Sequence, residues 1–469
     1  MNRRTFLASA LASPSASITA AARRPNFLFL IADDLTYNGI RGMGNSEVET
    51  PHLDALMARG CTFTRCFHQG SWTGAVCVAS RSMLNSGLTA FRVQKQIEQV
   101  ALWGQTMGDS GYDTSIVGKW HLSRTTLERS FHEREAVFMG GMFESGPDAY
   151  SRPSPGNMWT PWDKSRKGQW LPTQEWRKAA EAPVQHSAQI WADTAADRLL
   201  AREKTDDPFF LYVGFTSPHD PRQAPKEIVN RYPANKIAIP RNYRAEHAFD
   251  QGDQKVRDEL LAPFPRTREA VQLHRSEYYA HITYLDRQIG RILGALDRSG
   301  KSGNTYVIFT ADHGLAVGQH GLMGKQNLYD HSTRIPLIVA GPGIVKGRRV
   351  DEMVYQHSVF PTACGLAGVP VPKTVEFPDL TGWLRGSGGP KTDSVFCWYR
   401  DFQRSVRTRK HKLIAYPQAG KVQIFNLQKD PWETRDVGDE PGYAALRKDL
   451  MALLKKHQRE LDDPLTITL

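Results

Sequence analysis

The stretch Phe27-Leu28-Phe29-Leu30-Ile31-Ala32-Asp33-Asp34 decides the fold that this sequence predicts. An apolar run without polar alternation is typical of a strand that is buried on both faces of a parallel sheet. The run stops at two carboxylates, and open α/β sheets bind their ligands beyond the carboxyl ends of the strands. Asp33 and Asp34 therefore indicate either a site for a hard cation or carboxylates that stabilise a turn or a helix start.

The same construction, an apolar run next to residues that carry chemistry, occurs four more times. The runs and their polar neighbours are 113–117 with Lys119 and His121, 208–215 with His219, 305–310 with Asp312 and His313, and 334–340 with Lys325 before it. Each of these side chains, taken alone, has an ordinary explanation as a turn residue or a solvated charge. Because the ends of parallel strands meet at one edge of a sheet, we expect them to converge on one crevice.

The remaining segments complete an α/β fold. Helical spacing or capping signals predict helices over 51–59, 187–204 and 266–296, which would flank a large, mostly parallel central sheet. From Ser394 onward, short alternating segments at 404–408, 412–416 and 422–427 predict a small antiparallel sheet, and 442–461 a final helix. We expect a catalytic domain over 23–390 and a small α+β subdomain over 391–469.

One long segment, 138–176, is irregular and contains four tryptophans. An indole can stack on a sugar ring, so this segment is a candidate wall of a substrate site. A long loop packed on itself is the alternative.

Residues 1–22 are predicted to be an export signal. A basic start with Arg3-Arg4 leads through Phe6-Leu7 into an Ala- and Ser-rich stretch that ends at Ala20-Ala21-Ala22. The arginine pair favours a twin-arginine signal over a general secretory one, and both predict a periplasmic or secreted protein. No later run reaches the roughly 18 apolar residues of a membrane span.

Composition adds the class of partner. The chain has 469 residues, 40% of them hydrophobic, and a formal net charge of +11. This charge favours an anionic partner such as a sulfated polymer, nucleic acid or an anionic surface, or is simply a solvated basic surface. No nucleic-acid motif accompanies it, so we expect no nucleic-acid partner. Of the five cysteines, Cys61 and Cys66 are near enough in sequence to form a disulfide, which remains an open possibility.

The cysteine that bears on function is Cys77, in the stretch Cys77-Val78-Ala79-Ser80-Arg81. A helix-compatible run with Met83 and Leu84 follows it, so Cys77 would lie at a helix N-terminus, where unpaired amides favour a negative charge. Arg81 would lie one turn on, on the same side. A small buried cysteine is the alternative for these residues alone.

The pattern resembles the signature of type I sulfatases, whose cysteine is oxidised to formylglycine. Here the third position is Ala79, and Ser86-Gly87 stands where the family has Thr-Gly. The resemblance extends from about residue 24 to residue 436, with the motifs in the family's order: Asp33-Asp34, the Cys77 motif, Gly118-Lys119-Trp120-His121, Pro218-His219, Asp312-His313-Gly314, Lys325, and the text from Leu427 to Glu433.

This resemblance implies an alkaline-phosphatase-like fold and a bound Ca²⁺. Its ligands would be Asp33, Asp34, Asp312, His313 and the modified Cys77, with His313 where many relatives have Asn. Because imidazole is a softer ligand than an amide oxygen, another divalent ion stays open. Arg81 would hold the formylglycine, and Lys119 and Lys325 would neutralise the sulfate. His219 would protonate the leaving oxygen as the sulfate becomes bound covalently to the hydrated formylglycine. His121 would then take a proton from the second hydroxyl of that residue, so that the sulfate is released.

The sequence thus predicts a sulfuric ester hydrolase acting on a sulfated carbohydrate, with Gln319-His320 near the sugar and a formylglycine-generating maturase as a transient partner. Two alternatives stay open. One is a phosphonate or phosphate monoester hydrolase of the same superfamily. The other is a non-catalytic protein that binds polyanions on the same scaffold.

Overall fold

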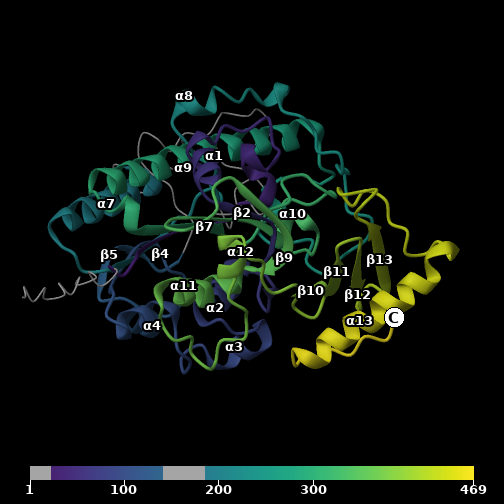
Figure 1. The fold of residues 1–469 in the computed structure, drawn as a ribbon. Helices are drawn as coiled ribbons and strands as arrows, with labels where there is room; N and C mark the ends of the chain where they lie inside the picture. Colours follow the sequence, from purple (N-terminus) through teal and green to yellow (C-terminus); the bar gives the residue numbers. More distant parts are fainter. Residues whose placement is uncertain (1–22, 141–184, 263) are drawn as a thin grey trace, which may run out of the picture.

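A large twisted sheet lies between two layers of helices, and a smaller sheet lies beside it, as the computed structural model shows (Figure 1). The structure describes residues 23–140, 185–262 and 264–469. The predicted signal at 1–22 and most of the tryptophan-rich segment at 138–176 lie outside the described residues.

The main sheet has eight strands in the order β5-β4-β6-β1-β7-β8-β2-β9. All neighbours pair in parallel except β8, which runs antiparallel to both β7 and β2. The strands are β1 Asn26–Ala32, β2 Cys61–Phe67, β4 Asp113–Lys119, β5 Glu133–Phe138, β6 Phe209–Gly214, β7 Thr305–Ala311, β8 Arg334–Ala340 and β9 Arg348–Tyr355. The predicted α/β fold with a mostly parallel sheet is confirmed.

Strand β1 lies in the middle of the parallel part because its residues suit burial on both faces. It pairs with β6 on one side and β7 on the other, and all seven of its residues are buried. The polar residues that follow β1, β4, β6 and β7 therefore meet at one edge of the sheet.

Strand β8 departs from the expected parallel arrangement. Since it runs opposite to β7, its first residue lies at the edge where β7 ends. Lys325, which precedes β8, is brought to the same edge as the residues that follow the parallel strands. Although β8 is antiparallel, Lys325 therefore still lies at the predicted edge of the sheet.

The two helical layers cover opposite faces of this sheet (Figure 1). On one side α7 and α1 pack against the long helix α9, and on the other α2 contacts α3, α4 and α11. The helices are α1 Pro51–Arg59, α2 Val76–Ser86, α3 Ala90–Gln96, α4 Trp103–Asp109, α5 Arg124–Ser130, α7 Ser187–Ala201, α8 Lys226–Val229, α9 Arg268–Arg298, α10 Asp330–Thr333, α11 Val359–Ala367, α12 Thr381–Arg385 and α13 Ala444–Glu460. The predicted helices coincide with α1, α7, α9 and α13.

The smaller sheet has the strand order β13-β12-β11-β10-β3. Its strands are β3 Gly70–Ser71, β10 Ser394–Tyr399, β11 Gln403–Thr408, β12 His411–Tyr416 and β13 Lys421–Asn426. The sequence predicts the antiparallel meander but not β3, which precedes Cys77. Gly70 is required there, because a Cβ at its φ of +118° would meet the Trp398 carbonyl oxygen at 1.8 Å.

The possible Cys61–Cys66 disulfide is absent, because all five cysteines are free thiols. Both residues lie on β2. A strand rises about 3.3 Å per residue, so five residues separate the two by roughly 16 Å, too far for a disulfide.

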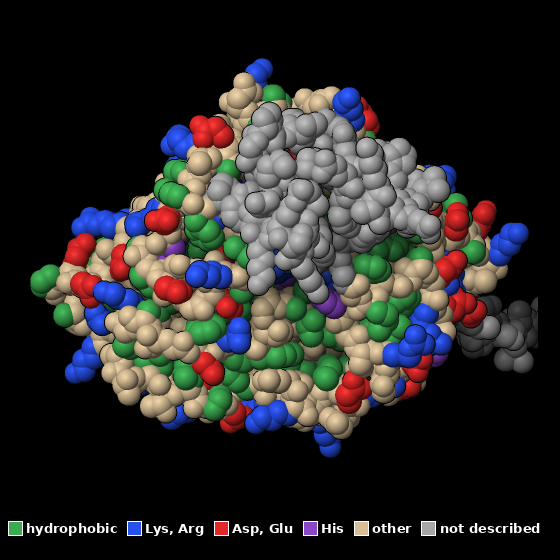
Figure 2. Space-filling model, turned by 180° about the vertical axis from the view of Figure 1, so that it is seen from behind, with side chains coloured by type: hydrophobic (Ala, Val, Ile, Leu, Met, Phe, Trp, Pro, Cys, Tyr) green, Lys and Arg blue, Asp and Glu red, His purple; other side chains and the backbone are tan. Residues whose placement is uncertain are grey.

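Within the described part of the chain, no helix has the length and apolar character to cross a membrane. Basic and acidic side chains are interspersed over the described atoms of the face in Figure 2. The net positive charge is therefore not gathered into one patch on that face.

Candidate active site

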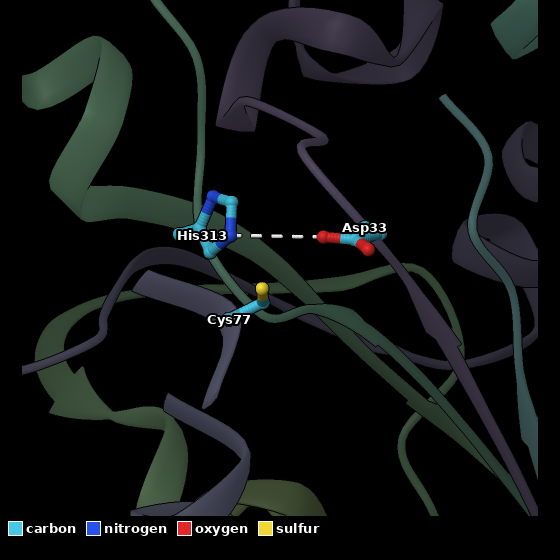
Figure 3. A group of neighbouring side chains, drawn as sticks. All are labelled: Asp33, Cys77 and His313. Atoms are coloured by element: carbon cyan, nitrogen blue, oxygen red, sulfur yellow. Dashed lines mark ion pairs between the residues drawn. The ribbon is translucent and has the colours of Figure 1, made fainter. Parts of the chain in front are cut away.

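Cys77 lies at the start of α2, at the edge of the sheet where β1 and β7 end. The helix begins at Val76, so Cys77 occupies its first turn, as predicted. Asp33 follows β1 and His313 follows β7, and the Cys77 sulfur points toward the space between these two side chains (Figure 3). Cys77 Sγ lies 3.2 Å from Nδ1 of His121, which follows β4.

The carboxylates and His313 form one buried cluster. His313 Nε2 lies 3.6 Å from Asp33 Oδ1 and 3.5 Å from Asp312 Oδ1, and His313 Nδ1 lies 3.2 Å from Asp34 Oδ1. Burial opposes protonation of His313, but Asp312, Asp34 and Cys77 together outweigh it and raise the pKa of His313 to about 9. Burial, with Asp33 close by, raises the pKa of Asp312 to about 6.

Arg81 fixes Asp312 and the end of β4. Its Nε donates to Asp312 Oδ2 at 3.0 Å and its Nη1 donates to the Lys119 carbonyl at 2.7 Å, with the side chain fully buried. The geometry therefore gives Arg81 a scaffold role that the sequence motif does not indicate: it joins helix α2 to the ends of two strands.

Two lysines hold the aspartates after β1. Lys119 Nζ donates to Asp33, and Lys325 Nζ donates to Asp34 Oδ1 at 2.8 Å. The Lys119 charge also acts on Cys77: burial alone would raise the pKa of this thiol, but Lys119 helps to bring it well below its usual range. A thiolate at this position is therefore stabilised by the site.

His219 lies between acids and a lysine. Its Nδ1 contacts the Asp220 carbonyl at 2.8 Å, and its Nε2 lies 2.9 Å from Lys325 Nζ and 3.6 Å from Asp34 Oδ2. Burial lowers the pKa of His219, but the Asp34 and Asp220 carboxylates together outweigh burial and raise it above the ordinary value. A protonated imidazole is thus favoured at the edge of the site.

These side chains face a cavity of about 360 Å³. Cys77, Lys119, His121, His219 and Lys325, all predicted from sequence, line it. The volume falls in the range of small-ligand sites in proteins.

Three polar or charged lining residues were not predicted: Arg257, Asp258 and Gln326. Arg257 donates to both oxygens of Asp220, the neighbour of His219, at 2.7 and 3.2 Å. Gln326 donates to the Gly74 carbonyl at 2.9 Å and to Asp258 at 2.7 Å. They lie in irregular segments without periodicity, and the position of Gln326 next to Lys325 was the available signal.

Two site residues have a strained backbone. Asp34 has a φ of 67° and His121 a φ of 65°, in the left-handed region that non-glycine residues rarely occupy. Such outliers persist where the surrounding structure holds them, and they cluster at functional sites.

The cluster has the donor set for a divalent cation. Asp33 Oδ1, Asp34 Oδ2 and His313 Nε2 are buried and have no hydrogen-bond partner within the described ranges. Among the described residues, ligand atoms of Asp33, Cys77 and His313, and of Asp33, Asp34 and His219, lie within 4.8 Å of one another. Asp312 belongs to neither group; Arg81 engages one of its oxygens and backbone amides the other.

The expected sugar contact of Gln319 and His320 is not supported. Both side chains are buried; His320 stacks on Tyr329 at 3.8 Å between ring centroids, and Asn242 contacts both. Neither lines the cavity beside Cys77.

Solved structures of hydrolases share this fold. The structure of a phosphonate monoester hydrolase of Agrobacterium radiobacter matches with a TM-score of 0.72 and 21% identity, covering 93% of this chain and 96% of that one. A structure solved in complex with its substrate D-glucosamine-2-N,6-O-disulfate matches with a TM-score of 0.69 and 19% identity, covering 94% and 99%.

The sequence then gives the family. The family described as Sulfatase matches residues 25–369, and the one described as N-sulphoglucosamine sulphohydrolase, C-terminal, matches residues 318–460. An arylsulfatase of Clostridium perfringens is 25% identical over 483 residues, covering 94% of this chain and 96% of the relative. The chain belongs to the sulfatase family and is an enzyme that hydrolyses sulfate esters. A non-catalytic role, one of the alternatives left open above, is therefore not supported.

Proposed function

We propose that this sulfatase removes sulfate from a sulfated saccharide, with residue 77 converted to formylglycine and a Ca²⁺ ion bound beside it. The observation that carries the proposal is the meeting of Cys77 with Lys119, His121, His219 and Lys325 around one cavity. The Cys77 sulfur marks where the oxygens of the modified side chain would lie. The related fold that was solved with a disulfated glucosamine supports a saccharide substrate.

The metal would be held by Asp33, Asp34 and His313, each of which has a buried atom without a hydrogen-bond partner in the described ranges, with Asp312 and residue 77 as further ligands. Carboxylate oxygens favour Ca²⁺, and the imidazole keeps other divalent ions open. When bound, such a cation neutralises negative charge on the sulfate group and on residue 77.

Other side chains would neutralise the substrate's charge and position residue 77. Lys119 and Lys325 place two ammonium groups where a sulfate must lie to reach residue 77, so they would offset the charge of an anionic substrate. Arg81, held between Asp312 and the Lys119 carbonyl, would keep helix α2 and residue 77 in place.

Two histidines would move protons. His219 would donate from Nε2 to the departing sugar oxygen, since Asp34 favours its protonated form. His121, with Nδ1 next to residue 77, would accept a proton from a hydroxyl there. Hydrated formylglycine supplies one hydroxyl as the nucleophile and a second whose deprotonation releases sulfate, which a plain thiol cannot do.

We also propose an export route and a division of the chain. Residues 1–22 would direct the protein through a twin-arginine route to the periplasm, or outside the cell. Because that route carries folded chains, a maturase would modify Cys77 in the cytoplasm first. The catalytic domain would span 23–390 and the small subdomain 391–469, with β3 of the former extending the sheet of the latter.

The test combines mass analysis with a substrate panel. We expect the peptide spanning residue 77 to carry the mass of formylglycine in active preparations, and defined sulfated oligosaccharides to be desulfated. Full turnover by protein whose peptide mass is that of cysteine would contradict the modification.

A second candidate function is hydrolysis of phosphonate or phosphate monoesters. The phosphonate monoester hydrolase fold, which matches this chain at a TM-score of 0.72, favours it. The ratio of kcat/KM for matched aryl sulfate and aryl phosphonate esters decides between the two, and we expect it to favour sulfate.

A further inference from the structure

A second cavity, of about 450 Å³, lies beside the one that contains Cys77. It is lined by residues of five separate segments: Trp72 after β3, Phe91 and Gln94 on α3, Trp398, Arg400, Asp401, Phe402 and Arg404 around the β10–β11 turn, Gln418 after β12, and Pro464 after α13. None of these residues enters the proposed mechanism.

The linings of the two cavities are close along the chain. Trp72 lines the second cavity and Gly74 the first, and two residues span at most about 7 Å of backbone. This backbone is anchored to the small sheet, because Gly70 and Ser71 pair with Trp398 and Tyr399. This short stretch of backbone connects the lining of one cavity to that of the other.

A second connection runs through the β10–β11 turn. Tyr399 and Arg400 both donate to Asp253, which precedes the active-site residues Val256 and Arg257 by a few positions. Gln403, at the start of β11, donates to the Gln326 carbonyl at 3.2 Å. The turn that lines the second cavity is thus fixed to two segments that line the first.

The lining has the chemistry of a saccharide site. Trp72 and Phe402 are partly exposed rings, and a flat aromatic face suits the apolar face of a sugar. Arg400 is 45% exposed, and Asp401 is exposed as well, so a cation and an acceptor for hydroxyl groups lie side by side.

Trp398 forms a mostly buried part of the lining of the same cavity. Trp398 is 4% exposed, and its indole Nε1 finds no hydrogen-bond acceptor in the part of the chain that the structure describes. One ring face is covered by Phe91 at 4.0 Å between centroids, and the Arg404 guanidinium lies 5.1 Å from the ring centroid. The indole therefore contributes a buried apolar wall to the cavity, and its Nε1 is not accessible to a ligand.

Arg404 itself is not available to a ligand. It is fully buried, both Nε and Nη2 donate to Asp463, and Nη1 donates to the Gln403 carbonyl. The cation that can meet an anionic substituent is therefore Arg400, since Asp253 engages its Nη1 and the exposed guanidinium carries further N–H groups.

We propose that this cavity binds a second sugar ring of the same saccharide chain whose sulfate is removed at residue 77. The ring would lie against Trp72, and Arg400 would favour a ring that carries a sulfate or a carboxylate. The inference rests on the proposed function, since it assigns a further part of the same substrate.

Substrate length is the variable that tests it. The probes are 4-nitrophenyl sulfate and a ladder of di-, tetra- and hexasaccharides from a sulfated polymer that the enzyme accepts. For Trp72→Ala and Arg400→Ala we expect KM to rise about tenfold for tetra- and hexasaccharides, as loss of one aromatic or charged contact predicts. Turnover of 4-nitrophenyl sulfate should stay within about twofold of the parent enzyme, because these residues do not touch the sulfate.

The matched control is Trp383→Ala, which removes a partly exposed tryptophan on α12. It should leave KM unchanged for every probe, and Trp72→Phe should restore most of the loss at Trp72. Thermal unfolding of each variant shows whether it folds.

The outcomes separate the two hypotheses. If the enzyme hydrolyses 4-nitrophenyl sulfate but KM for the ladder is the same in parent and pocket variants, the second subsite is wrong and the proposed function stands. The second subsite is also wrong if Trp383→Ala raises KM as much as the pocket variants do. If no sulfate ester is hydrolysed by formylglycine-bearing protein, the proposed function itself fails.

Discussion

At the scale of single residues, His219 is expected to act through the proton that it holds. His219→Ala should slow sugar sulfates by about a hundredfold or more, the usual contribution of a general acid. Hydrolysis of an activated aryl sulfate, whose leaving group needs no proton, should slow by less than about tenfold. Lys325→Ala is the comparison, because removal of a charge that faces the sulfate should slow both substrates. Equal losses for both substrates in His219→Ala would remove His219 from the acid role.

The unpartnered atoms of Asp33, Asp34 and His313 predict a thermal response to metal. Adding Ca²⁺ to chelator-treated protein should raise Tm, since a ligand at about one hundred times its Kd stabilises the folded state by about 2.7 kcal/mol. Asp33→Asn and His313→Ala should abolish the rise, and Asp206→Asn, at an exposed position, should leave it intact. If no divalent cation changes the Tm of the parent protein, the metal site is refuted.

At the scale of elements, a buried ion network joins the small sheet to the segment that carries Lys325. Lys412 on β12 donates to Asp330 at 2.8 Å and to Glu433 at 2.7 Å, and Arg407 on β11 pairs with Asp330 as well. Asp330 begins α10, five residues after Lys325.

Lys412→Met should therefore lower the free energy of unfolding by about 3–5 kcal/mol, because it leaves two buried carboxylates with too little positive charge. Lys410→Met, at an exposed position on the same hairpin, should cost less than about 1 kcal/mol. Urea unfolding measures both. A similar, small loss in the two variants would show that the network contributes little.

At the scale of the whole molecule, buried histidines predict loss of stability in acid. Burial lowers the pKa of His331 and of His357 to about 3, against 6.5 for an exposed imidazole. Below about pH 6.5 the unfolded chain binds protons that the folded chain does not, so stability falls as pH falls, by about 1.4 kcal/mol per pH unit for each such group. The fall in stability levels off near the pKa of the histidine in the folded protein.

The check is the urea midpoint between about pH 7.5 and pH 5, compared between the parent and His357→Phe. The His357 ring packs against Phe377 at 4.6 Å, so phenylalanine keeps the packing and removes the titration. The variant should lose less stability in acid than the parent. An identical pH dependence would show that His357 does not contribute.

The sequence by itself determined the strands that carry the site and the residues at their ends. The apolar run 27–32 could form little else than a central buried strand, and the runs before Lys119, His219 and Asp312 are similar. Because strand direction and order place such ends at one edge, convergence could be predicted before any contact was known.

Only the tertiary structure decided which side chains contact one another. It turned Arg81 toward Asp312, placed Arg257 against Asp220, and brought Trp72 and Arg400, more than three hundred residues apart, to one cavity. These contacts depend on how irregular segments cross between the two sheets, and no period in the sequence encodes such a crossing. Strand β3, two residues long, became recognisable only through its pairing with β10, since a strand that short carries no pattern of its own.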